Sequence, residues 1–260
     1  MEKEKLDELK IQLQQLFSKA QEFVQEIPPG QLYTATGIVL FTAFLFTVIY
    51  RLKHRSANTI LLTGLSGSGK TVLFYQLRDG FSHRDSVTST KPNEGRFLLH
   101  SEANKLQKGR IHVVDVPGHS RLVAKLDEFL SQAAGIIFVV DSVEFLPHLR
   151  VASEYLYDIL TNASVVKGKT PLLLLCNKMD KITAHSTDFI RRQLEKEINK
   201  LRASRTALSS ADTSNEYTLG VVGEAFAFSQ CQNKVTTAEA SALTGDIYHL
   251  EQFIRECVKP

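Results

Sequence analysis

Hydrophobic and polar positions alternate in a regular way from about residue 56 to the C-terminus. Short apolar runs are separated by stretches of helical periodicity, which is typical of βαβ units around a mostly parallel sheet. Two of the runs, GIIFVV and LLLLC, are continuously apolar, as in central strands that helices cover on both faces. We therefore expect an α/β fold with a doubly wound, mostly parallel sheet, whose strands lie at 59–63, 97–100, 110–114, 135–140, 172–176 and 235–240.

The C-terminal pattern predicts a helix that closes the sheet. From Asp246 onward, one helical face carries Leu250, Phe253, Ile254 and Cys257. One segment breaks the regularity: residues 203–219 are rich in Ser, Thr and Ala and have little periodicity. They predict a flexible surface insertion within a domain that spans 58–260.

A different pattern precedes this domain. Residues 32–50 contain no charged side chain, and the basic cluster RLKHR follows at 51–55. At 1.5 Å per residue the run spans about 28 Å, close to the hydrocarbon thickness of a bilayer. It predicts a single transmembrane helix at 31–50 and a basic linker at 51–57, with a buried core helix as the alternative. The positive charges after the run place the C-terminal domain in the cytosol.

The first 30 residues predict an amphipathic helix on the lumenal side. Leu6, Leu13, Ala20 and Ile27 repeat every seven residues, and a second apolar set interleaves with them. A partner helix and a helix lying on the membrane surface both explain this stripe.

Composition excludes several classes of function. The 260 residues include 31 Lys and Arg against 28 Asp and Glu, so the net charge of +3 gives no reason to expect nucleic-acid binding. The three cysteines are far apart and have no metal-ligand spacing, which argues against disulfides and zinc and favours a reducing compartment.

The first chemical motif, GLSGSGKT, follows the first predicted strand and precedes a helix. Its glycines allow successive N–H groups to wrap a phosphate, and the helix adds its positive N-terminal end. Lys70 is expected to reach the β and γ phosphates, and the Thr71 hydroxyl to ligate Mg²⁺. The expected phosphate-binding residues are Gly64, Leu65, Ser66, Gly67, Ser68, Gly69, Lys70 and Thr71.

Two further motifs narrow the choice of nucleotide ligand. In DVPGH, Asp115 can hold the water shell of magnesium and the Gly118 N–H can meet a γ-phosphate. In NKMD, the Asp180 carboxylate can accept from N1–H and the exocyclic amine of guanine, a donor pair that adenine lacks. Asn177 would tie this loop to the phosphate loop, and the Lys178 stem would cover the base.

The last motif is EASAL at 239–243, where the N–H groups of Ser241 and Ala242 are expected to point at the guanine O6. All four motifs follow predicted strands, at the edge where doubly wound sheets bind ligands. The expected cofactors are therefore GTP and Mg²⁺.

The order of these motifs resembles that of the small Ras-like GTPases, nearest to the Arf and Sar branch. With the N-terminal span and the FAFSQ segment at 226–230, the chain is similar to the family of signal recognition particle receptor beta subunits. This resemblance implies residence in the endoplasmic reticulum membrane. It also implies docking of the receptor alpha subunit on the GTP-bound switches, with the ribosome or translocon as further candidate partners.

Two positions depart from the Ras-like pattern. His119 stands where a glutamine usually positions the attacking water, so it is the candidate catalytic residue, and a solvent-facing switch residue is the alternative. In switch I, Thr88 is expected to join Thr71 and Asp115 at the metal, although Ser89 or Thr90 could serve instead.

These residues favour a membrane-anchored, GTP-dependent docking subunit with slow or partner-controlled hydrolysis. The alternatives are an autonomous GTPase that cycles in vesicle budding and a structural anchor whose nucleotide pocket has decayed. A permanent span argues against the first alternative, and the intact motifs argue against the second.

Overall fold

The computed structural model describes residues 29–53, 59–80, 92–98, 111–118, 123–209, 217–221 and 223–258. Contacts within the chain divide it into two units, Met1–Arg55 and Ser56–Pro260. Several expectations fall outside the described residues and stay predictions: the N-terminal helix as far as residue 28, most of the basic linker, the switch I hydroxyls of Thr88, Ser89 and Thr90, and His119.

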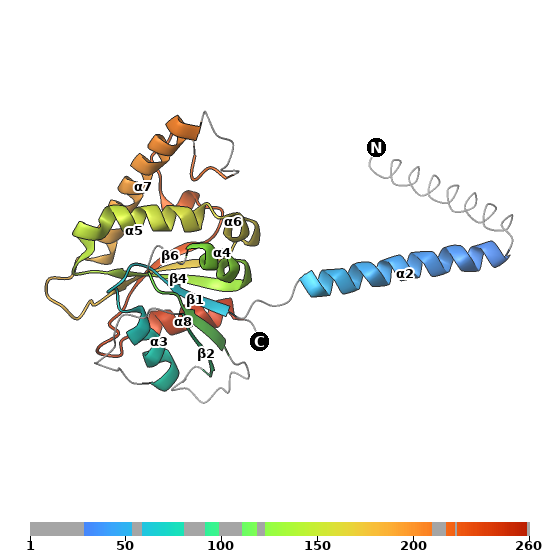
Figure 1. The fold of residues 1–260 in the computed structure, drawn as a ribbon, viewed down its shortest axis with the longest axis horizontal. Coiled ribbons are helices and arrows are strands. Elements are labelled where there is room, and N and C mark those ends of the chain that lie inside the picture. The colour runs from blue at the N-terminus through green and yellow to red at the C-terminus, as the bar shows by residue number, and fades with distance from the viewer. Residues whose placement is uncertain are drawn as a thin grey trace, which may run out of the picture. The chain divides into compact units, whose positions relative to one another are not determined.

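The second unit is built on one six-stranded sheet of order β2-β3-β1-β4-β5-β6 (Figure 1). All neighbouring strands are parallel except β2, which runs antiparallel to β3. The strands are β1 (Thr59–Thr63), β2 (Asn93–Phe97), β3 (Ile111–Asp115), β4 (Ala133–Asp141), β5 (Leu172–Asn177) and β6 (Val235–Glu239). The predicted mostly parallel sheet is confirmed.

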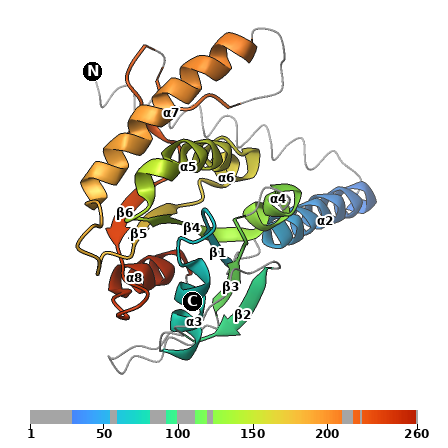
Figure 2. The ribbon, with the colours of Figure 1, turned by 60° about the vertical axis from the view of Figure 1, so that its left-hand side comes forward.

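Helices cover both faces of this sheet, as Figures 1 and 2 show. On β1, Ile60 and Leu62 belong to a buried cluster with α3 and α8, whereas Leu61 belongs to the cluster on the opposite face. The sheet is therefore doubly wound, as expected. The helices are α3 (Lys70–Asp79) and α8 (Tyr248–Cys257) on one face, and α4 (Val123–Gln132), α5 (Phe145–Leu160), α6 (Ala163–Gly168) and α7 (Thr187–Ser209) on the other, with a short 3-10 helix η2 (Phe228–Gln230).

The second strand lies four residues earlier than predicted. Its sequence, NEGRF, is polar, and its side chains are at most half-buried because β2 is an edge strand with a single neighbour. Hydrophobic periodicity signals burial and is weak in such a strand. The closing helix likewise begins at Tyr248 rather than Asp246, because Asp246 pairs with Ser241 in an isolated bridge.

The predicted insertion at 203–219 is partly wrong. Helix α7 continues to Ser209, so residues 203–209 are helical, in agreement with their Ala, Arg and Leu content. The described chain resumes at residue 217. There the carbonyl oxygens of Leu219 (3.3 Å) and Val221 (2.9 Å) accept hydrogen bonds from Arg202 of α7. The Arg202 guanidinium thus helps to hold the returning chain to the helix, together with Asn199 and Glu195, which accept from the backbone N–H groups of Phe226 and Phe228.

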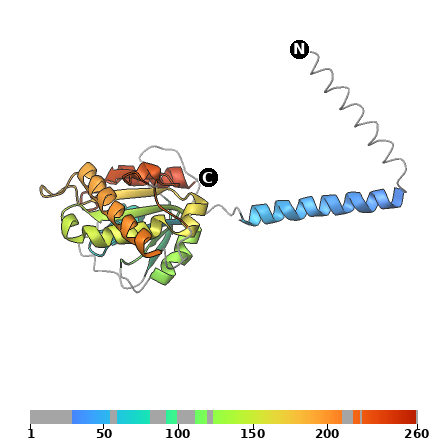
Figure 3. The same cartoon turned by 90° about the horizontal axis from the view of Figure 1, so that it is seen from above.

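The first unit contains α2 (Pro29–Lys53), a continuous helix of 25 residues (Figure 3). Its described apolar side chains are exposed, including Ile38, Phe41 and Phe46. The hydroxyls of Thr42 and Thr47 donate to carbonyl oxygens one turn back. Among the residues with described placement, no helix has both the length and the apolar character needed to cross a membrane. The transmembrane helix therefore stays a prediction.

Candidate functional site

The phosphate loop joins β1 to α3 and has the predicted backbone. Gly64, Gly67 and Gly69 have φ angles of 128°, 80° and 89°, a region that side chains with a Cβ rarely adopt. At Gly69 a Cβ would also lie 2.3 Å from the Asn177 side-chain nitrogen. The loop therefore needs glycine here both for its conformation and for its approach to the base loop.

The first turn of α3 makes this loop electropositive. No side chain caps α3, whose N-cap is Gly69, so its first N–H groups face the loop. The Lys70 ammonium also lies at the phosphate loop, where it donates to the Leu65 carbonyl at 2.7 Å; the residue is 6% exposed. The Ser68 hydroxyl donates to that carbonyl as well. Donors converge on one small loop, which favours an anion.

Burial lowers the pKa of the Lys70 ammonium to about 8, although the nearby Asp115 carboxylate opposes the shift. The charged form of Lys70 is thus less favoured in the protein alone than in a solvent-exposed lysine. An anionic group bound beside the ammonium would raise this pKa again, since it stabilises the charged form. This is the electrostatic behaviour that a phosphate site requires.

Asp115 is the candidate metal ligand. Its side chain is fully buried, and one oxygen accepts from the Thr71 hydroxyl (2.7 Å) and from the Asn93 amide (3.0 Å). The other oxygen, Oδ1, is buried and has no hydrogen-bond partner among the described residues. A buried carboxylate oxygen without a partner is costly. A hydrated magnesium ion would satisfy it, so the residues present fit this metal.

Sequence reasoning missed Asn93. It stands opposite Asp115 in the antiparallel β2–β3 register, and the predicted second strand began only at residue 97. If the start of β2 had been predicted correctly, the pairing of β2 with β3 would have placed Asn93 beside Asp115. Gly118 does lie at the phosphate loop as expected, since a Cβ there would come within 2.4 Å of the Gly64 carbonyl oxygen.

The base loop is tied to the phosphate loop as predicted. The Asn177 amide nitrogen donates to the Ser68 carbonyl oxygen at 2.8 Å, and the amide oxygen accepts from the Ala242 N–H at 3.0 Å. Asn177 is 1% exposed, so both bonds form away from water. One buried side chain thereby connects the loops after β1, β5 and β6.

Beside Asn177 lies a cavity of about 280 Å³, lined by Gly69, Val72, Asn177, Lys178, Asp180, Lys181, Ala242 and Leu243. Asp180 accepts from the Ser241 hydroxyl at 2.8 Å and lies 3.3 Å from the Lys181 ammonium. The Ser241 hydrogen bond, aided by Lys181, holds the pKa of the Asp180 carboxyl below its usual value. Asp180 is therefore an oriented, ionised acceptor at this cavity.

The Ser241 and Ala242 N–H groups of EASAL have partners within the protein. The Ser241 N–H donates to the Asp246 carbonyl and the Ala242 N–H to the Asn177 amide oxygen. The contact of these two N–H groups with the guanine O6 stays a prediction. The Ser241 hydroxyl, which the motif did not suggest, orients Asp180.

Proteins that join a phosphate loop to a base loop in this way, at this edge of a doubly wound sheet, are P-loop small GTPases, and this chain has their fold. Residues 55–235 match the sequence profile of the signal recognition particle receptor beta subunit family. The chain belongs to this family.

Individual relatives agree with this assignment. The chain is 35% identical to the mouse signal recognition particle receptor subunit beta, over 89% of this chain and 88% of the relative. A solved structure of the mammalian SRP receptor has a TM-score of 0.67 and 36% identity, and covers 76% of this chain and 99% of its own.

A further solved structure, from Chaetomium thermophilum, is an SRb-GTP/SRX complex. It has a TM-score of 0.59 and 22% identity, and covers 76% of this chain and 96% of its own. At this identity the likeness concerns the fold.

The Asn177 bridge generates a first prediction. Asn177→Ala leaves the Ser68 carbonyl and the Ala242 N–H unpaired in the interior, at about 1–3 kcal/mol of unfolding free energy for each group. Denaturant unfolding should show this loss, and GDP affinity should fall at least about tenfold because the two loops separate.

Asn233→Ala is the matched control. Asn233 is also a buried asparagine, 3% exposed, and donates to the Thr170 carbonyl at a position that does not line the cavity. This variant should lose stability and keep its GDP affinity. Equal GDP affinity in both variants would contradict the bridging role of Asn177.

Proposed function

We propose that this chain binds GTP with Mg²⁺ and, in that state, docks the alpha subunit of the signal recognition particle receptor at the endoplasmic reticulum membrane for co-translational protein targeting. The Asn177 bridge carries the proposal, because it holds a phosphate loop and a guanine-selective loop in one rigid arrangement. Family membership supports the same conclusion.

Each part of GTP has a match among the described residues. The phosphates meet the N-terminus of α3 and the buried ammonium of Lys70. Guanine would enter the cavity beside Asp180, where its N1–H and amine are the donors that an ionised carboxylate needs. Adenine lacks that donor pair and would not form these hydrogen bonds with Asp180, which is the physical basis of selectivity.

Asp115 and Thr71 would hold magnesium through the hydroxyl and the unpartnered Oδ1 oxygen. The metal supplies positive charge against the β and γ phosphates. Thr88 is proposed as the third ligand. Hydrolysis is slow or stimulated by a partner in this proposal, and His119 is the proposed residue that orients the attacking water.

The nucleotide state can reach a partner through the DVPGH segment. Gly118 lies against the phosphate loop at Gly64, three residues after the metal-binding Asp115. A γ-phosphate in the loop would therefore act directly on the segment that begins switch II. In the relative from Chaetomium thermophilum, GTP and SRX occur in one complex, which supports docking by the GTP-bound form.

Membrane attachment is proposed for α2. Its apolar side chains are exposed along the described part of the helix, and its threonine hydroxyls bond to the helix backbone, as polar groups in a bilayer must. The basic residues at and beyond its C-terminal end favour a GTPase domain on the cytosolic side of the endoplasmic reticulum membrane. A permanently attached protein gains little from a budding cycle whose output is membrane release.

The guanine assignment is tested by Asp180→Asn. An amide in place of the carboxylate can donate to the oxygen that xanthine carries instead of the guanine amine. Competition binding with GDP and XDP should therefore show a preference moved toward xanthine by at least about a hundredfold, which is the scale of a buried hydrogen-bond mismatch. An unchanged preference would remove Asp180 from the base site.

Alpha-subunit docking is tested by affinity capture. The alpha subunit should be recovered with the GTP-loaded chain and lost after Thr71→Asn, because an amide cannot replace the hydroxyl at magnesium. Recovery of equal amounts with GDP and GTP would contradict a docking surface that depends on nucleotide.

Membrane attachment is tested by alkaline carbonate washing of membranes that contain the full-length chain. A spanning helix should stay in the pellet, since apolar burial does not depend on charge. Replacement of Leu40 and Phe44 by lysine should release the chain, whereas Thr42→Ser should not. Extraction of the unaltered chain would contradict the anchor.

A further inference from the structure

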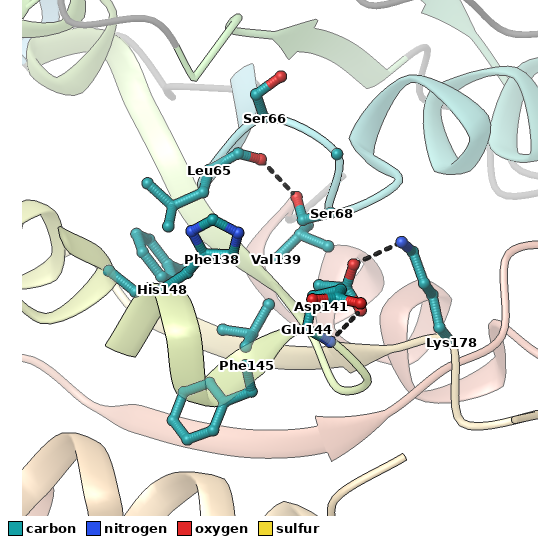
Figure 4. A pocket seen from close by; sticks show the side chains of 13 residues that line it. Leu65, Ser66, Ser68, Phe138, Val139, Asp141, Glu144, Phe145, His148 and Lys178 are labelled. Atoms are coloured by element: carbon teal, nitrogen blue, oxygen red, sulfur yellow. Dashed lines mark hydrogen bonds and ion pairs between the residues drawn. The ribbon is translucent and has the colours of Figure 1, made fainter. Parts of the chain in front are cut away.

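Asp141 occupies a junction that no motif predicts. It is the last residue of β4 and stands beside Asn177 in the register of β4 with β5. One carboxylate oxygen accepts from the backbone N–H groups of Val143 (2.9 Å) and Glu144 (3.2 Å). The other accepts from the Lys178 ammonium at 2.5 Å, as Figure 4 shows. The Asp141 side chain is 15% exposed and the Lys178 side chain 36%, so the ion pair is partly shielded from water.

Lys178 separates two cavities. On one side it lines the base cavity with Asp180. On the other it lines a second cavity of about 280 Å³ between the phosphate loop and α5, whose wall includes Phe138, Asp141 and Phe145 (Figure 4). The long side chain can therefore lie against the base site only if its ammonium is held at the far end, since a free lysine samples many rotamers.

The backbone of Lys178 also needs support. Its φ angle of 68° is uncommon for a residue with a side chain. The neighbouring backbone is already fixed, because the Ser142 N–H donates to the Asn177 carbonyl and the His185 N–H to the Ser142 carbonyl. Asp141 fixes the end of the Lys178 side chain, and no other contact of that ammonium is described.

We propose that Asp141 is a positioning residue of the guanine site: it holds the Lys178 ammonium so that the lysine stem closes one side of the base cavity and slows nucleotide release. The inference rests on the proposed function of GTP binding and extends it to a residue outside the four motifs. Asp141 acts through Lys178 and has no contact of its own with the base.

The variant Asp141→Asn tests the contact with Lys178 separately from the hydrogen bonds that Asp141 accepts from the Val143 and Glu144 N–H groups. The amide oxygen can still accept from the Val143 and Glu144 N–H groups, whereas the charge-assisted bond to Lys178 is lost. For the full-length chain in detergent, the dissociation rate of fluorescent mant-GDP should rise about tenfold. The preference for guanine over xanthine should not change, because Asp180 keeps its own contacts.

Glu144→Gln is the matched control. It removes the same charge from the same turn, and the ion pair described for Lys178 is with Asp141 rather than with Glu144. Its mant-GDP dissociation rate should stay within about twofold of the wild type. A wild-type rate in Asp141→Asn, or an equal increase in Glu144→Gln, would overturn the inference.

A double-mutant cycle with Lys178→Met provides a second readout that a merely structural role would not produce. Once the ammonium is gone, Asp141→Asn should add no further increase in dissociation rate. A full additional increase would show that Asp141 acts independently of Lys178 and would overturn the proposal. Failure of the wild type to bind any guanine nucleotide would instead overturn the proposed function.

Discussion

The site depends on one buried amide. Asn177 is almost inaccessible to solvent, yet its side chain carries both a donor and an acceptor, and each is used: one for the phosphate loop and one for the loop after β6. Because an unpaired polar group in the interior is costly, each of these three loops holds the others in place. The phosphate and base sites are consequently parts of one structure, and a ligand that spans both meets a surface formed in advance.

Charge burial explains why that surface suits a nucleotide with a metal. Lys70 and Asp115 are both withdrawn from solvent. Burial lowers the pKa of the Lys70 ammonium, and one Asp115 oxygen has no hydrogen-bond partner among the described residues. A bound phosphate would stabilise the lysine cation, and magnesium would give the carboxylate oxygen a positively charged neighbour. At the edge of the base cavity, Asp141 and Lys178 form an ion pair that belongs to the same pattern of paired charges.

Sequence patterns failed where burial was partial or where contacts came from distant segments. The edge strand β2 is polar, so its start and the approach of Asn93 to Asp115 were missed. Helix α7 continues into a segment whose composition suggested a loop, and Arg202 then holds the returning chain. The EASAL motif did not reveal that the Ser241 hydroxyl donates to Asp180 or that the Ala242 N–H donates to Asn177, because both contacts join segments that are far apart in the sequence.

The sequence by itself determined the elements and the chemistry: alternating apolar runs give a doubly wound sheet, glycines at fixed spacing give a phosphate loop, and each acid follows a strand. These are local properties, set by side-chain periodicity and backbone freedom. Only the tertiary structure decided which hydrogen-bond donors are used within the protein, which carboxylate oxygen lacks a partner and which acid holds Lys178. The physical reason is that these hydrogen bonds and ion pairs form between the ends of different strands. Those ends lie far apart in the chain and become neighbours only when the sheet forms.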